Sequence, residues 1–185
     1  GLNILGTHDT PRILTLLGAD DIPESREGRA AYHLSPQARA TALRRLTLAA
    51  MLLFTFPGSP TIYYGDEVGM EGFEDPLNRR TFPWGHEDER LLAVFQTLGL
   101  LRKERPSLQS GDLTYLTAEG GLLIYRRQRE RESTYTLLNT GETPREISLP
   151  WPDSFAVDAL TLQRFWVRGG MLRLTLPPCD GLILC

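Results

Sequence analysis

The stretch Asn3-Ile4-Leu5-Gly6-Thr7-His8-Asp9-Thr10 decides how this 185-residue chain is interpreted. An apolar run over Leu2–Gly6 predicts a buried strand, and it ends abruptly in an imidazole and a carboxylate. In parallel α/β barrels the catalytic groups lie at the carboxyl ends of the strands, which is where His8 and Asp9 would stand. The alternative is a plain helix start, with Asp9 or Thr10 as the N-cap and the following proline in the first turn.

The same pattern returns further along the chain. Pro60–Gly65 is rich in β-branched and aromatic residues, which predicts a second buried strand, and Asp66 and Glu67 follow it directly. For Glu67 we expect a structural role, such as an ion pair with Arg12. Helices are predicted before and after this strand, and charged loops between them. The expected helices span 11–17, 35–56 and 87–104, and the expected loops span 19–34 and 68–84. Alternating strands and helices favour a parallel sheet with right-handed crossovers.

The pattern of predicted secondary structure changes near residue 110. From Asp112 onward, short strand-like runs alternate with turns such as Gly120-Gly121 and Asn139-Thr140-Gly141. This spacing predicts an antiparallel β-sandwich. The expected strands are 113–117, 122–128, 133–138, 145–149, 171–176 and 182–185. The fold class is therefore α/β plus all-β, with one domain over residues 1–110 and a second over 111–185.

A few prominent side chains receive structural interpretations. Tyr63 and Tyr64 are expected in the core of the first domain. Trp151 and Trp166 are expected to fill the sandwich. The run Arg126–Glu132 alternates in charge, which is typical of a solvated strand and turn.

Composition excludes several classes of protein. The hydrophobic fraction is 41% and the charged fraction 23%, ordinary values for a globular chain, and the formal net charge is −3. A nucleic-acid partner is not expected, because phosphates require a basic surface. The longest apolar run, Leu48–Phe56, is about half the roughly 20 residues that a membrane helix needs. Cys179, Cys185 and three scattered histidines predict neither a disulfide framework nor a zinc site, and we expect no metal or cofactor.

Three segments together resemble the α-amylase superfamily of glycoside hydrolases. The segment Asn3-Ile4-Leu5-Gly6-Thr7-His8-Asp9 is similar to that family's barrel strand seven. Gly58-Ser59-Pro60-Thr61-Ile62-Tyr63-Tyr64-Gly65-Asp66-Glu67 is similar to strand eight, and Asp75-Pro76-Leu77-Asn78-Arg79-Arg80-Thr81-Phe82-Pro83-Trp84 to the loop that follows it. The order is that of the family, and a β-sandwich follows. The nearest subgroup is that of neopullulanases, cyclomaltodextrinases and maltogenic amylases. The resemblance thus implies the terminal portion of a (β/α)₈ barrel, strands seven and eight with their helices, followed by a sandwich.

The resemblance also assigns roles to individual residues. Asp9 falls on the carboxylate that stabilises the transition state, and His8 on a residue that binds sugar hydroxyls beside it. Asp75 and Arg79 fall on the loop residues that hold a neighbouring sugar, for which the planar guanidinium is suited. Their alternative is a surface salt bridge worth under about 1 kcal/mol. The loop 19–34 is longer than the family's usual connection.

The nucleophile and the general acid of the family have no counterpart here. The family's nucleophile lies in a Gly-x-Arg-x-Asp run, which does not occur in this sequence. A complete barrel needs about 250 residues, so we expect this chain to be part of a longer retaining α-glucan hydrolase and inactive alone. The alternative function is a non-catalytic carbohydrate-binding or assembly module, and both hydrolysis and transglycosylation remain open. Exposed strand edges predict that the isolated chain self-associates.

Overall fold

The computed structural model describes residues 1–185, which divide into two compact units. The first unit comprises residues 1–53 and 58–96, and the second comprises residues 54–57 and 97–185. Two long helices, α3 (Pro36–Thr55) and α4 (Glu89–Glu104), each begin in the first unit and end in the second. No helix is both long enough and apolar enough to cross a membrane.

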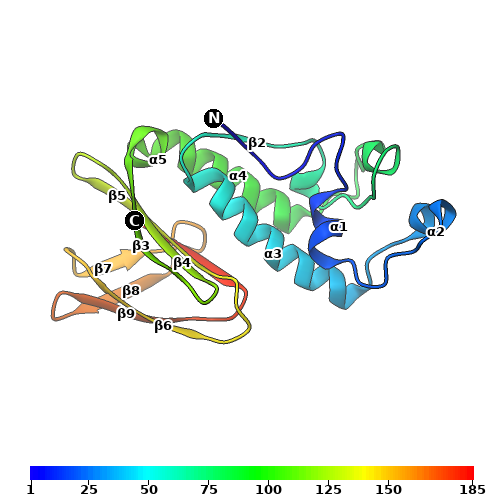
Figure 1. The fold of residues 1–185 in the computed structure, drawn as a ribbon. Helices are drawn as coiled ribbons and strands as arrows, with labels where there is room; N and C mark the ends of the chain where they lie inside the picture. Colours follow the sequence, from blue (N-terminus) through cyan, green and yellow to red (C-terminus); the bar gives the residue numbers. More distant parts are fainter. The chain divides into compact units, whose positions relative to one another are not determined.

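The first unit contains a two-stranded parallel sheet close to the amino terminus of the chain, which is marked N in Figure 1. Strand β1 (Leu2–Ile4) pairs with β2 (Ser59–Thr61), and Asn3 lies opposite Pro60. The predicted parallel pairing is therefore present. The prediction of two buried strands is wrong for this chain, because both strands are short and each has only one neighbour. Leu2 is 72% exposed and Ile62, just after β2, is 41% exposed.

The helices of the first unit follow the predicted pattern closely. Helix α1 spans Ile13–Gly18, and α3 begins after Ser35, whose Oγ accepts a hydrogen bond from the Ala38 amide at 3.2 Å. Gly18 lets α1 approach α3, because a Cβ there would lie 2.6 Å from the Ala42 Cβ. The core of this unit is made by apolar side chains of α1, α3, α4 and the loop after β2: Leu14, Ala42, Leu46, Val68, Leu91 and Phe95.

The predicted loop over 19–34 contains a helix. Helix α2 (Arg26–Ala31) begins after Ser25, whose Oγ accepts a hydrogen bond from the Gly28 amide at 3.0 Å. The helix has no buried residue, so no apolar period marks it in the sequence. It is held by polar contacts: Arg29 forms an ion pair with Glu74, and the Arg80 guanidinium donates to the Ala30 carbonyl at 2.7 Å.

The loop after β2 carries two short 3₁₀ helices, η1 (Asp66–Val68) and η2 (Leu77–Arg79). Gly65, with φ of 90°, allows the backbone to turn into η1. Gly72 is held close to η2, because a Cβ at Gly72 would lie 2.3 Å from the Leu77 carbonyl oxygen. The Gly72 carbonyl accepts the Arg12 amide at 2.8 Å, which ties this loop to the start of α1.

Replacing Gly72 by Ala is expected to lower the free energy of unfolding by about 1–3 kcal/mol, because the new methyl group meets backbone that cannot easily move. Urea denaturation of the 185-residue chain followed by circular dichroism measures this. Gly99→Ala within α4 is the matched control. Its methyl group would meet only a Phe54 ring carbon at 3.9 Å, and the substitution is expected to raise stability by about 0.5–1 kcal/mol. A Gly72→Ala variant as stable as the parent chain would contradict the close approach.

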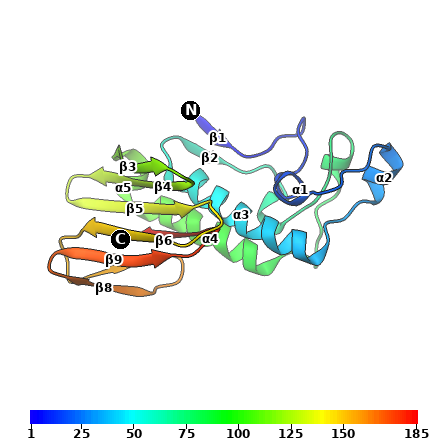
Figure 2. The same cartoon turned by 60° about the horizontal axis from the view of Figure 1, so that its bottom comes forward.

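The second unit holds a short helix, α5 (Pro106–Ser110), and two antiparallel four-stranded sheets (Figure 2). One sheet has the order β10-β5-β4-β3 and the other the order β6-β9-β8-β7. The strand bounds are β3 Asp112–Glu119, β4 Leu122–Arg129, β5 Glu132–Asn139, β6 Arg145–Pro150, β7 Phe155–Val157, β8 Arg164–Arg168, β9 Met171–Leu176 and β10 Asp180–Leu184. The sequence predicted six of these strands and missed β7, β8 and helix α5.

The two sheets share one hydrophobic core, as a β-sandwich requires. Alternate residues of both sheets point inward and pack together: Leu122, Ile124, Leu137, Ile147, Leu149, Leu172, Leu174 and Leu176. Trp151 is buried in this core beside Tyr135, as predicted. The prediction for Trp166 is wrong: it lies on the outer face of β8, is 66% exposed, and stacks edge-on against Phe155.

The charged run after Tyr125 is only partly solvated. Arg127 is 2% exposed, and its guanidinium donates to the carbonyls of Gly111 and Thr55 at 2.8–3.1 Å. The predicted solvated strand is therefore wrong at this residue. The alternation of β4 places Arg127 on the face opposite Leu122 and Ile124, where the carbonyls of Gly111 and Thr55 replace its water shell.

Candidate active site

Asp9 lies in a tight turn after β1 and not at a helix cap. Helix α1 begins at Ile13 with Arg12 in the N-cap position, and no side chain caps it. The turn is closed by Thr7 and Thr10: the Thr7 amide donates to the Thr10 Oγ1 at 2.9 Å, and the Asp9 amide donates to the Thr7 Oγ1 at 3.1 Å. The helix-start interpretation of Asp9 is therefore wrong, and its carboxylate is 73% exposed.

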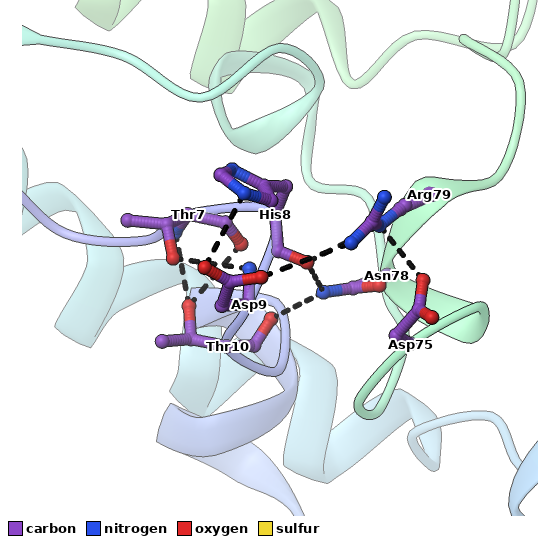
Figure 3. A network of polar contacts seen from close by, with 7 residues as sticks. All are labelled: Thr7, His8, Asp9, Thr10, Asp75, Asn78 and Arg79. Atoms are coloured by element: carbon purple, nitrogen blue, oxygen red, sulfur yellow. Dashed lines mark hydrogen bonds and ion pairs between the residues drawn. The ribbon is translucent and has the colours of Figure 1, made fainter.

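The four residues singled out in the sequence come together in one cluster (Figure 3). The His8 Nε2 lies 3.3 Å from one Asp9 carboxylate oxygen, and the Arg79 Nη2 lies 3.8 Å from the other. The Arg79 Nε donates to the Asp75 Oδ1 at 2.7 Å. Side chains separated by some seventy residues in sequence thus surround one exposed carboxylate with two nitrogen-bearing groups.

Asp75 and Arg79 form the surface salt bridge that the sequence offered as the alternative to a sugar-binding role. Its side chains are 59% and 46% exposed, so the bridge itself contributes little to stability. It turns the guanidinium toward Asp9, and the Arg79 Nε also donates to the His8 carbonyl at 3.3 Å. The cluster thus exposes both carboxylate acceptors and guanidinium and imidazole nitrogens on one surface.

Asn78 was not predicted as a functional residue, although it lies within the Asp75-Pro76-Leu77-Asn78-Arg79 stretch. Its side chain is fully buried, and its Nδ2 donates to the carbonyls of His8 at 2.7 Å and Thr10 at 2.8 Å. These contacts join residues about seventy positions apart, so no local pattern in the sequence marks Asn78.

Asp66, and not Glu67, is the acid that pairs with Arg12. The Arg12 Nη1 lies 3.2 Å from the Asp66 Oδ1 and also donates to the Tyr64 carbonyl. Both ionic side chains are almost completely buried, at 0% and 4% exposed. The expected Glu67–Arg12 pair is therefore wrong: the turn at Gly65 points the first acid inward.

Burial dominates the electrostatics of this pair. Desolvation raises the pKa of Asp66 to about 6, and the attraction of Arg12 only partly opposes it. The Arg12 guanidinium lies over the rings of Tyr63 and Tyr64, with its carbon 4.3 and 4.6 Å from their centroids. Its Nε and Nη2 have no hydrogen-bond partner. The two tyrosines, expected in the core, are partly exposed and form one wall of the Arg12 site.

Comparison with known proteins identifies the family of this chain. The α-amylase catalytic domain family matches residues 2–109. The chain belongs to the α-amylase family. The C-terminal domain family of maltogenic amylases matches residues 113–183, so the α-amylase portion is followed by the antiparallel domain that the resemblance implied. No group of three or more His, Cys, Asp or Glu side chains is placed to hold a metal ion.

Relatives within the α-amylase family cover nearly the whole chain. An amylopullulanase of Thermoanaerobacter thermohydrosulfuricus is 37% identical over 99% of this chain, and a cyclomaltodextrinase of Geobacillus thermopakistaniensis is 32% identical over 95%. The chain spans 13% and 27% of those two proteins. Among solved structures, an Anoxybacillus α-amylase aligns over 98% of this chain and 37% of its own, with a TM-score of 0.78 and 27% identity. The Geobacillus thermoleovorans α-amylase, solved with acarbose, aligns over the same shares with a TM-score of 0.76 and 28% identity.

Proposed function

We propose that this chain is the carboxyl-terminal part of a retaining α-glucan hydrolase, in which Asp9 stabilises the transition state. The single observation that supports this most is the exposed Asp9 carboxylate, flanked by His8 and Arg79, in a chain of the α-amylase family. An exposed carboxylate that caps no helix and forms no buried ion pair is available to a substrate.

The chemistry assigned to Asp9 is electrostatic. Glycosidic cleavage passes through an oxocarbenium-like state, so a fixed carboxylate beside the sugar ring lowers its energy. The nucleophile and general acid would come from earlier segments of the protein, with their carboxyl groups about 5 Å apart as a retaining mechanism requires. His8 would bind hydroxyls of the same sugar, and Asp75 and Arg79 would hold a neighbouring one.

The domain organisation follows from the same proposal. Residues 1–110 would supply barrel strands seven and eight with their helices, and residues 111–185 would form the separate sandwich domain. The candidate substrates are maltodextrin, cyclodextrin and pullulan, because relatives are named amylopullulanase, cyclomaltodextrinase and neopullulanase. Replacement of Asp9 by Asn in the full-length protein, with turnover of maltodextrin as the readout, tests the proposal.

The isolated 185-residue chain is expected to self-associate through the β1–β2 region. Leu2, Ile4 and Ile62 are 72%, 48% and 41% exposed beside a sheet in which each of the two strands has only one neighbouring strand. Apolar side chains and open strand edges together favour association. Light scattering at tens of micromolar is expected to report a mass above that of the monomer, falling on dilution.

A charged side chain introduced in the β1–β2 region is expected to weaken the self-association of the chain. Leu2→Lys is expected to shift the chain toward monomer. Leu162→Lys, at a comparably exposed leucine of the second unit (75% exposed), is the matched control and should leave the association unchanged. A clean monomer for the unmodified chain, or equal effects of the two lysines, would contradict the proposal.

A further inference from the structure

Asn78 holds the Asp9 turn through two short hydrogen bonds that come from a fully buried side chain. Its amide lies on the inner side of the turn and reaches two backbone carbonyls, those of His8 and Thr10, which flank Asp9 in sequence (Figure 3). Both partners can only accept hydrogen bonds, so the NH₂ group must face them and the side-chain oxygen must face away. The orientation of the amide is thereby set by chemistry.

The two ion pairs of the Asp9 carboxylate are too weak to fix the direction of this side chain. His8 at 3.3 Å and Arg79 at 3.8 Å are exposed partners, and water competes with exposed ion pairs. The direction of the Asp9 carboxylate therefore depends on its backbone. Asn78 anchors the peptide before Asp9 through the His8 carbonyl and the peptide after Thr10 through the Thr10 carbonyl, from a side chain with no solvent exposure.

This arrangement carries a stability cost. The Asn78 Oδ1 is buried and has no hydrogen-bond partner. A buried acceptor without a partner opposes folding, and such groups are rare enough in folded proteins to call for an explanation. An apolar side chain would avoid the cost and would leave the two carbonyls unanchored.

We propose that Asn78 is a positioning residue for Asp9: it fixes the backbone on both sides so that the carboxylate is presented in one direction. The inference rests on the proposed function of Asp9 and adds to it a residue that does not touch the sugar. Because misplacing a catalytic group by about 1 Å can cost about 10²-fold in rate, loss of the anchor should act on turnover.

The test is Asn78→Asp in the full-length protein. The change keeps the shape and replaces the donating NH₂ by an oxygen that faces two carbonyl oxygens. The expected result is a fall in kcat on maltodextrin of about 10- to 100-fold, with KM changed by less than about 3-fold. An unchanged kcat in the folded variant would overturn the proposal.

Asn139→Asp is the matched control. Asn139 is equally buried, and its Nδ2 donates to the carbonyls of Thr143, Leu176 and Pro177 in the second unit. This variant is expected to lower the melting temperature and to leave kcat of the folded protein unchanged. If the two variants reduce kcat equally, Asn78 has only a general structural role. If Asn78→Asp does not fold, Asn78→Ser, whose side chain is too short to reach the two carbonyls and places no carboxylate against them, should also lower kcat.

A double-mutant comparison separates this proposal from the proposed function. With Asp9 replaced by Asn, the further change Asn78→Asp should alter the residual kcat by less than about 2-fold, because there is no catalytic carboxylate left to position. An undiminished loss in that background would overturn the positioning role alone. Near-normal turnover of Asp9→Asn by itself would refute the proposed function instead.

Discussion

Asp9→Asn in the full-length protein is expected to lower kcat on maltodextrin by about 10²- to 10³-fold. The substitution keeps the size and the hydrogen-bonding oxygen of the side chain and removes the negative charge that would face the oxocarbenium-like state. Because the interaction is strongest in the transition state, KM should change far less than kcat. Steady-state kinetics with reducing-end detection measures both.

The control for this experiment is Asp153→Asn, an exposed aspartate on the second unit. It removes the same charge from the protein and should leave kcat within about 2-fold. Near-normal turnover of Asp9→Asn would refute the transition-state role, even if the full-length protein proved to be an α-glucan hydrolase. The exposure of the Asp9 carboxylate predicts in addition that the substitution barely changes the melting temperature.

Arg12→Met is expected to destabilise the chain by about 3–5 kcal/mol at pH 7. The methionine replaces the stem of the side chain and removes the cation, so at pH 7 Asp66 must either stay charged without a counter-charge or bind a proton, and each costs free energy. The contacts of the guanidinium with Tyr63 and Tyr64 are lost as well. Denaturant titration of the 185-residue chain measures the free energy of unfolding.

The stability of this region should also depend on pH through Asp66. The pKa of its carboxyl is raised from 3.8 to about 6 by burial, so between about pH 4 and 6 the folded state binds more protons than the unfolded state. Stability from this group is therefore fully present below about pH 4 and is lost as the pH rises through 6, by at most about 3 kcal/mol. In Arg12→Met the loss should continue to higher pH, because without the cation the pKa of Asp66 rises further.

The double variant Arg12→Met/Asp66→Asn serves as the control. It removes both charges, and at pH 7 it should recover much of the stability that Arg12→Met loses. Its stability should also lack the dependence between pH 4 and 6 that Asp66 gives the unmodified chain. If Arg12→Met were equally costly at pH 4 and pH 7, or if the double variant were less stable than the single one, the buried ion pair would not be the source of the effect.

Local patterns predicted the elements that carry the strongest periodic signals. The helices α3 and α4 were expected over 35–56 and 87–104, and they span Pro36–Thr55 and Glu89–Glu104, because long amphipathic helices with caps are recognisable in sequence. The parallel pairing of β1 and β2 followed from the strand–helix–strand order. Helix α2 was missed because it has no buried side chain and hence no apolar period.

The sequence did not predict the directions in which several side chains point. Whether Asp66 or Glu67 would meet Arg12 depends on the turn at Gly65, and two adjacent acids look alike in sequence. Trp166 and Arg127 were mispredicted because both lie on sheet faces away from the sandwich core, and only the folded structure shows that the first face is exposed and the second is covered. Composition alone assigns a tryptophan to a core and an arginine to a surface.

The sequence by itself determined the family resemblance and the residues grouped around Asp9, because these are carried by short runs in which residue type and spacing are specific. The tertiary structure decided how that carboxylate is held. Asn78 meets His8 and Thr10 across some seventy residues of chain, and Asp66 meets Arg12 across a similar distance in sequence. Such contacts depend on backbone directions that the folded loops set together, so they leave no pattern that can be recognised along the chain.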